Sequence, residues 1–129
     1  MALKRRRPGL VYPVWEDWHY VGGTDEPAFE NSWSNLGTYS AMAFRLRETG
    51  IVDLVGAVQH SGDSNTTIFT IPVGYRPTDV TFLTGRSEST VSSEACVLGI
   101  ETNGRVKLYS TASQYVWFAG SYFLDAATP

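Results

Sequence analysis

From residue 41 onward, turn-forming residues interrupt the chain so often that no long helix can fit. Runs of β-branched and aromatic residues alternate with clusters of Gly, Pro, Asn, Asp and Ser. No stretch carries apolar residues at helical spacing without Gly or β-branched residues among them. About seven short strands joined by regular turns are typical of sandwiches and barrels. The sequence therefore predicts an all-β fold, either an antiparallel β-sandwich or a jelly-roll-like barrel.

The expected strands follow from these apolar runs and from the turns that bound them. They cover residues 41–47, 51–58, 66–71, 79–83, 95–101, 105–109 and 115–123. Residues 85–93 are polar and Ser-rich, which predicts an exposed loop. Residues 15–38 have weak periodicity and predict mostly loop, with one short strand near residues 18–21.

The clearest local signal is the Asn103-Gly104 pair between two apolar runs. Asn and Gly both tolerate positive φ, as the two central residues of a tight hairpin turn require. The pair therefore predicts a two-residue turn that joins residues 96–101 to residues 105–110.

The 129 residues divide into a short arm and one domain. Residues 1–14 predict an extended arm, because Pro8, Gly9 and Pro13 prevent a helix and disfavour a central strand. Residues 15–129 predict a single β domain that can bury a sizeable core.

Charge is distributed unevenly between the arm and the domain. Residues 4–7 hold four of the ten basic residues, which leaves six basic against thirteen acidic residues beyond them, a net charge of −7. A basic tail can bind phosphates, but so acidic a domain repels a duplex, so no nucleic-acid partner is expected. An acidic protein surface fits the arm better, with apolar arm residues adding contacts. The predicted docking residues are Lys4, Arg5, Arg6, Arg7, Leu10, Tyr12 and Trp15.

No motif with catalytic or metal-binding spacing occurs in the sequence. The histidines His19 and His60 stand 41 positions apart, and no nucleophile elbow, zinc helix or phosphate loop is found. The single cysteine, Cys96, lies in an apolar run and predicts a small buried side chain. No apolar run is long enough to span a membrane, and no signal peptide is expected. We therefore expect a protein that is not an enzyme and has no metal or cofactor.

From about Trp33 to Phe123 the chain resembles a family of β-rich head domains. Such domains occur in bacteriophage tail-fibre, receptor-binding and minor structural proteins. The resemblance rests on residues 31–35, 44–50, 51–58, 68–77 and 103–104. Its most specific part is the run of residues 68–77, in which a strand ends at a proline and a Gly-Tyr-Arg-Pro turn follows.

The resemblance implies a structural motif without a catalytic residue. Ile68 and Ile71 should bury apolar side chains, Pro72 should end the strand, and Gly74 should permit the turn. Tyr75 should fold back onto the sheet, while Arg76 should pair or donate to backbone carbonyls. The predicted motif residues are Ile68, Phe69, Pro72, Gly74, Tyr75, Arg76, Pro77, Asn103 and Gly104.

The resemblance also implies a virion protein on the surface of a phage capsid or tail, and a homotrimer. Only about 30 residues precede the matching region, too few for a fibre shaft, so we expect a capsid-decoration protein of the cement or head-fibre kind. Its partner would be the major capsid protein or another virion protein. The alternative is a receptor-binding head that recognises host-surface glycan. The four tryptophans Trp15, Trp18, Trp33 and Trp117 could stack on sugars or fill the core and interfaces.

Overall fold

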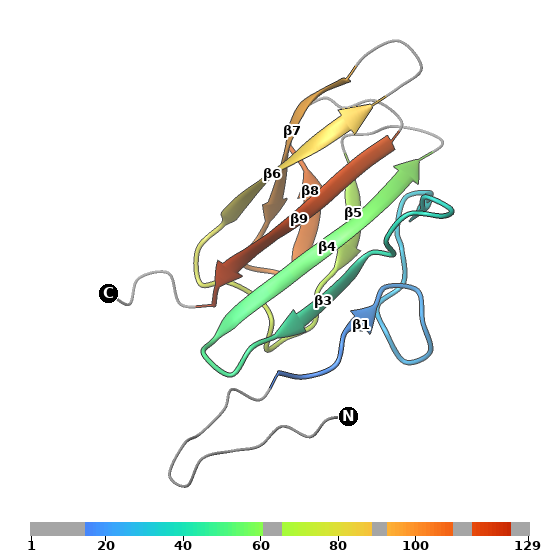
Figure 1. The fold of residues 1–129 in the computed structure, drawn as a ribbon. Coiled ribbons are helices and arrows are strands. Elements are labelled where there is room, and N and C mark those ends of the chain that lie inside the picture. Colours follow the sequence, from blue (N-terminus) through green and yellow to red (C-terminus); the bar gives the residue numbers. More distant parts are fainter. Residues whose placement is uncertain (1–14, 61–65, 89–92, 110–114, 125–129) are drawn as a thin grey trace, which may run out of the picture.

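A computed structural model describes residues 15–60, 66–88, 93–109 and 115–124 (Figure 1). These residues form one nine-stranded antiparallel sheet. The strands are β1 (His19–Tyr20), β2 (Trp33–Asn35), β3 (Ala43–Leu46), β4 (Ile51–His60), β5 (Thr67–Thr70), β6 (Thr81–Glu88), β7 (Ser93–Ile100), β8 (Arg105–Leu108) and β9 (Tyr115–Phe123). The described residues hold no helix, and so none that could cross a membrane. The predicted all-β antiparallel class is confirmed.

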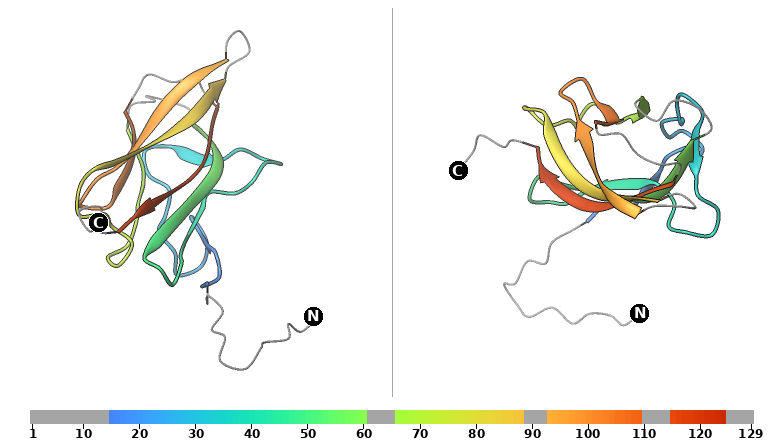
Figure 2. Two further views of the ribbon diagram at one scale, coloured as in Figure 1. Left: turned by 60° about the vertical axis from the view of Figure 1, so that its left-hand side comes forward. Right: turned by 90° about the horizontal axis from the view of Figure 1, so that it is seen from above.

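The sheet curls into a half-barrel. Its strand order is β1-β3-β4-β9-β6-β7-β8-β5, and β2 pairs with β4 beside β3. Figure 2 shows the curl, which brings β5 and β8 round to face the opposite end of the sheet. The rings of Phe44 on β3 and Phe69 on β5 stack across this space, 5.8 Å apart. One face of the sheet is therefore concave and filled by the core, and the other is an outer face.

A turn before β2 closes the open side of the half-barrel. The Glu30 N–H donates to the Ile68 carbonyl at 2.8 Å, and the Asn31 side chain donates to the Thr67 carbonyl at 3.0 Å. Asn31 and Ser32 both take positive φ, 53° and 66°, so the chain reverses and enters β2 at Trp33. This segment donates hydrogen bonds to backbone carbonyl groups on the outer edge of β5 that would otherwise remain unpaired.

The core is made by side chains that alternate inward along each strand. On β4 the inward positions are Val52, Leu54 and Val58, all without solvent exposure. On β7 they include Cys96, which is buried as predicted, and burial together with the charge of Glu94 raises the pKa of its thiol to about 11. Strands with one buried face and one solvated face explain why the periodicity in the sequence is close to two.

The motif that follows β5 forms a tight turn against the core. Ile68, Phe69 and Ile71 are buried, and the Tyr75 N–H donates to the Pro72 carbonyl across Gly74, whose φ is +101°. The predicted motif residues Arg76 and Pro77 follow this turn. The Arg76 Nε donates to the Ile71 carbonyl at 2.9 Å, and Pro77 is buried. The Tyr122 hydroxyl donates to the Tyr75 carbonyl at 2.7 Å, which holds the turn against β9.

The β7–β8 hairpin differs from the prediction in its turn. Only Gly104 of the Asn-Gly pair takes a positive φ, +95°. The Gly104 N–H donates to the Glu101 carbonyl, and the Glu101 N–H donates to the Arg105 carbonyl, both at 2.9 Å. The connection is therefore one residue longer, with a glycine in the left-handed region after an ordinary turn. The Asn103 side chain instead accepts the Arg105 N–H at 3.1 Å.

We expect Gly104→Ala to lower the free energy of unfolding by about 2 kcal/mol. A Cβ at this position would lie 2.6 Å from the Ile71 carbonyl oxygen, on a backbone conformation that alanine avoids. Asn103→Ala, which removes one exposed hydrogen bond, should cost about 1 kcal/mol or less. Urea denaturation of both variants gives the comparison. Equal losses would contradict the assignment of the special conformation to Gly104.

Two strand assignments from the sequence are wrong. Residues 85–88 belong to β6 rather than to a loop, and β2 lies within a stretch predicted to be mostly loop. Within residues 85–88 the outward side chains, Arg86 and Glu88, are polar because they face solvent, and the inward Ser87 is small and fully buried. Trp33 on β2 is buried because β2 pairs with β4. Both strands exist because of distant partners, which local hydrophobicity does not reveal.

Candidate functional site

A row of register partners, which begins with a tyrosine and continues with three small side chains, crosses the outer face of the sheet. The strand register places Tyr20 beside Ala43, Ala43 beside Val55, and Val55 beside Ala119. Residues paired in register point to the same face, so the four side chains form one line perpendicular to the strands. Between Tyr20 and Ala119 this line crosses three strand spacings, or about 14 Å. We call the hollow above this line the cross-strand trough.

Aromatic side chains form one wall of the trough. Trp117 lies one register row from Ala119, between Ala57 on β4 and Arg86 on β6. Its ring is in edge contact with the ring of Tyr39, with centroids 5.5 Å apart and planes at 90°. Tyr39 comes from the loop between β2 and β3 and is 57% exposed. The Arg86 guanidinium lies 5.8 Å from the Trp117 ring centre.

A polar row lies on the other side of the row that runs from Tyr20 to Ala119. The next register row places Arg45 beside Asp53 and Asp53 beside Ser121. Trp18 covers the end of this row, with its ring 4.2 Å from the Arg45 guanidinium. The trough thus has an aromatic wall and a floor of small side chains, and a row of paired polar groups lies beyond the floor.

Two hollows of about 570 and 290 Å³ lie along the trough. Trp117, Tyr39 and Arg86 line the larger hollow, and Trp18 and Tyr20 line the smaller one. Both hollows are also lined by Ser40 and Val55, so they adjoin. Their combined size lies in the range of small-molecule sites in proteins.

Asp53 is the central acceptor of the polar row. It is only 5% exposed, and it accepts hydrogen bonds from Arg45 Nε at 3.0 Å, from Arg47 Nη2 at 2.7 Å and from Ser121 Oγ at 2.6 Å. Burial alone would raise the pKa of Asp53. The hydrogen bonds from Arg47, Ser121 and Arg45 and the charge of Arg47 outweigh burial and lower this pKa to about 2.

Arg45 and Arg47 also contact the tryptophans that precede β1. The Arg45 guanidinium lies between two rings, 4.3 Å from the centre of Trp15 and 4.2 Å from that of Trp18. Arg47 lies 4.9 Å from the Trp15 ring. Trp15, which the sequence placed among the docking residues, therefore stacks on this domain's own arginines and stays 44% exposed. Lys4, Arg5, Arg6, Arg7, Leu10 and Tyr12 lie outside the described residues.

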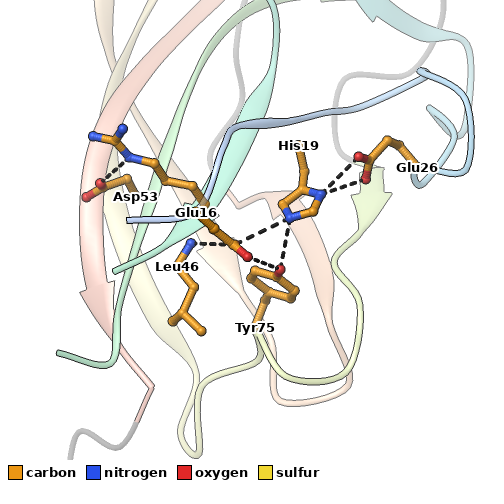
Figure 3. A network of polar contacts seen from close by, with 7 residues as sticks. Glu16, His19, Glu26, Leu46, Asp53 and Tyr75 are labelled. Atoms are coloured by element: carbon orange, nitrogen blue, oxygen red, sulfur yellow. Dashed lines mark hydrogen bonds and ion pairs between the residues drawn. The ribbon is translucent and has the colours of Figure 1, made fainter. Parts of the chain in front are cut away.

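A second polar cluster joins the segment before and after β1 to the motif that follows β5 (Figure 3). His19 Nδ1 lies 2.9 Å from a Glu26 carboxylate oxygen, and Nε2 lies 3.0 Å from the Tyr75 hydroxyl. That hydroxyl donates to Glu16 Oε1 at 3.0 Å, while Glu16 Oε2 accepts the Leu46 N–H at 2.7 Å. The cluster links three separate segments of the chain.

This cluster favours a protonated histidine. Because the Tyr75 hydroxyl donates to Glu16, both ring nitrogens of His19 must donate if every contact is to be a hydrogen bond. Burial would lower the pKa of His19, but the hydrogen bonds and charges of Glu26 and Glu16 raise it above its usual value. Burial would raise the pKa of Glu16, yet the Leu46 N–H, Tyr75 and His19 lower it. The Tyr75 pKa is raised to about 12 by burial and by Glu16, so this hydroxyl stays protonated.

We expect His19→Gln to lower the free energy of unfolding by the largest amount in weakly acidic solution. Because its folded pKa is raised, protonated His19 stabilises the fold fully below its unfolded pKa of about 6.5. This contribution is lost as pH rises through the folded pKa. Ionised Glu16, whose folded pKa is lowered, stabilises the fold above about pH 4.5. This stabilisation is lost as pH falls through the folded pKa of Glu16. The difference in urea midpoint between wild type and variant should therefore peak near pH 5 to 6.5. A difference that stays constant from pH 4 to about 9 would contradict the imidazolium assignment.

Neither polar cluster has the form of a metal site. Among the described residues, no group of three or more His, Cys, Asp or Glu side chains could hold a metal ion. His60, the second histidine, packs its ring against Trp33 at 4.7 Å, far along β4 from Asp53. The titratable side chains of both clusters hold one part of the domain to another.

The trough was not predicted as a site from the sequence. Trp117 and Trp18 were among the candidate stacking residues, but their neighbours in the trough were not identified. One signal was present, because alternation within residues 115–123 places Trp117, Ala119 and Ser121 on a single face. The predicted motif residues of 68–77 and 103–104 lie together, since Arg76 packs beside Gly104. They support the fold rather than the trough.

No protein-family model and no curated protein matches this chain.

Proposed function

We propose that this chain is a non-enzymatic structural protein of a bacteriophage particle, whose β domain acts as an exposed recognition module. One observation carries the proposal. Six of the eight large apolar side chains that the described residues expose are aromatic, whereas the charged clusters around Asp53 and His19 are occupied by internal contacts. Exposed aromatic side chains gathered on one face are typical of recognition surfaces.

The site of action on the particle follows from the resemblance and from the charge of the chain. A basic segment, residues 4–7, precedes a domain of net charge −7, and the start of the described chain is fixed by the Trp15–Arg45 stack. We propose that residues 1–14 dock on the major capsid protein or on another virion protein. A homotrimer would join three such arms and raise their combined affinity through effective concentration.

Deletion of residues 2–14 should abolish attachment to the particle and leave the domain folded. The nine strands lie beyond this segment, so the circular dichroism of the truncated chain should match that of the full chain. The measurement is co-sedimentation with particles that lack the protein. Charge reversal at Arg5, Arg6 and Arg7 should weaken binding, and added salt should do the same, since exposed ion pairs are screened over about 8–10 Å at physiological ionic strength.

A matched control alters charge without touching the arm. Arg105 is an exposed basic residue on β8, and its reversal to Glu should leave co-sedimentation unchanged. Attachment of the truncated chain at the wild-type level would overturn the anchoring role of the arm. Absence of the full chain from purified particles would overturn the virion assignment itself.

A further inference from the structure

The cross-strand trough has the features of a carbohydrate site. Sugar rings present flat C–H faces and hydroxyl edges, which match an aromatic wall and the polar side chains of Arg86 and Ser40 that line the larger hollow. Tyr20 and Tyr39 are 52% and 57% exposed, and Trp117 is partly exposed, with Tyr39 and Arg86 beside its ring. The floor of Ala43, Val55 and Ala119 leaves room for a ring to lie against these aromatic side chains.

The direction of the trough disfavours an extended peptide. Peptides that bind sheets add to a free strand edge, where backbone groups await partners. The trough instead runs across β3, β4 and β9, and each of these strands has neighbours on both sides. A ligand here meets outer-face side chains and the backbone of Gly56 and Gly85, so it is recognised by contacts with this surface and not by an added strand.

The charged side chains beside the trough are already paired with one another, which favours a neutral ligand. The Arg86 guanidinium is paired with Glu88 and also donates to Ser93 Oγ at 3.1 Å. Arg45 and Arg47 are both paired with Asp53. An acidic sugar would have to compete with these carboxylates, whereas a neutral sugar can donate to Glu88 and accept from Arg86 without separating them.

We propose that the cross-strand trough binds a short neutral oligosaccharide of pyranose units. The inference rests on the proposed recognition role of the domain, but it does not depend on attachment to a particle. Trp117 supplies the main stacking surface with Tyr39 against its edge, Tyr20 lies at the other end of the trough, and the Arg86–Glu88 pair bonds hydroxyl groups. The two adjoining hollows form neighbouring subsites for consecutive sugar units.

The experiment follows the Trp117 indole N–H by NMR in the isotopically labelled full chain. The probes are maltotriose, cellotriose and tri-N-acetylchitotriose as neutral trisaccharides, with sialyllactose as an acidic one. At least one neutral probe should shift the Trp117 signal with a dissociation constant on the order of 1 mM or tighter. Binding to Trp117→Ala, which lacks the indole, is followed through the backbone amide signals of Val55 and Ala119, and should be at least tenfold weaker, which is about 1.4 kcal/mol. Ala119→Leu, which fills the floor and keeps every aromatic ring, should weaken it similarly.

Phe123→Ala is the matched control. Phe123 is on the same strand and the same face, 61% exposed, and pairs with Ile51 outside the trough. The affinity of Phe123→Ala for the neutral trisaccharides should equal that of wild type. The proposal is overturned if no neutral probe shifts the Trp117 signal at about 10 mM, or if sialyllactose binds more tightly than all of them. It is also overturned if the signal broadens with protein concentration alone, because a second copy would then cover the face. Since no particle is present, failure of arm docking leaves this result unaffected.

Discussion

Phe44→Ala should lower the free energy of unfolding by about 3–5 kcal/mol, the range for a large aromatic side chain lost from a core. Phe44 has no solvent exposure, and its ring contacts three separate parts of the chain. It stacks on His19 at 5.2 Å and on Phe69 at 5.8 Å, and it meets the edge of Tyr75 at 5.0 Å. The cavity would therefore open where the segment around β1, strand β5 and the motif turn meet.

The measurement is urea denaturation, with Phe123→Ala as the comparison. Both changes remove the same atoms from strands of the same sheet, but the outward Phe123 should change stability by only about 0.5 kcal/mol. The NMR signal of His19 should also move in Phe44→Ala, since the ring loses its stacking partner. A loss similar to that of Phe123→Ala would show that the aromatic cluster does not form as described.

Hydrophobic periodicity predicted the long central strands and missed the ones that depend on partners. Strand β9 matches the expected residues 115–123, and β4 extends the expected residues 51–58 by two positions. Both are central, so their apolar character is dictated locally by burial. Strand β2 has one apolar residue in three, and it is a strand because it pairs with β4. Such pairing is a long-range property that no local window contains.

The trough was harder to predict than the fold because it is a product of register. Tyr20, Ala43, Val55 and Ala119 come from four strands, and a shift of one residue in any pairing would turn that side chain toward the core. The sequence shows which residues are aromatic, but not which of them meet. The polar clusters have the same origin, since His19 and Tyr75 are 56 positions apart. By contrast, the motif turn is local, and its proline and glycine are visible in the sequence.

Asp53→Ala should lower the free energy of unfolding by about 3 kcal/mol. Loss of one partner from a buried ion pair costs about 3–5 kcal/mol, and the lower end applies because Arg45 and Arg47 remain partly exposed. The variant also leaves the Ser121 hydroxyl without its acceptor. Asp53→Asn keeps an acceptor in the same place, so its loss should be smaller, about 1–2 kcal/mol. Thermal or urea unfolding at neutral pH ranks the two variants.

The dependence on pH separates the charge of Asp53 from its packing. Its folded pKa of about 2 lies below the unfolded value, so its contribution is present above about pH 4 and is lost as pH falls through the folded pKa. Wild type should therefore lose stability between about pH 4 and pH 2 more steeply than Asp53→Asn, and the two curves should converge at the acidic end. Since Arg45 also holds Trp15 and Trp18, the same acidification should loosen their rings in wild type. Parallel curves for the two proteins would mean that Asp53 acts through shape alone and that its charge contributes nothing to the outer face.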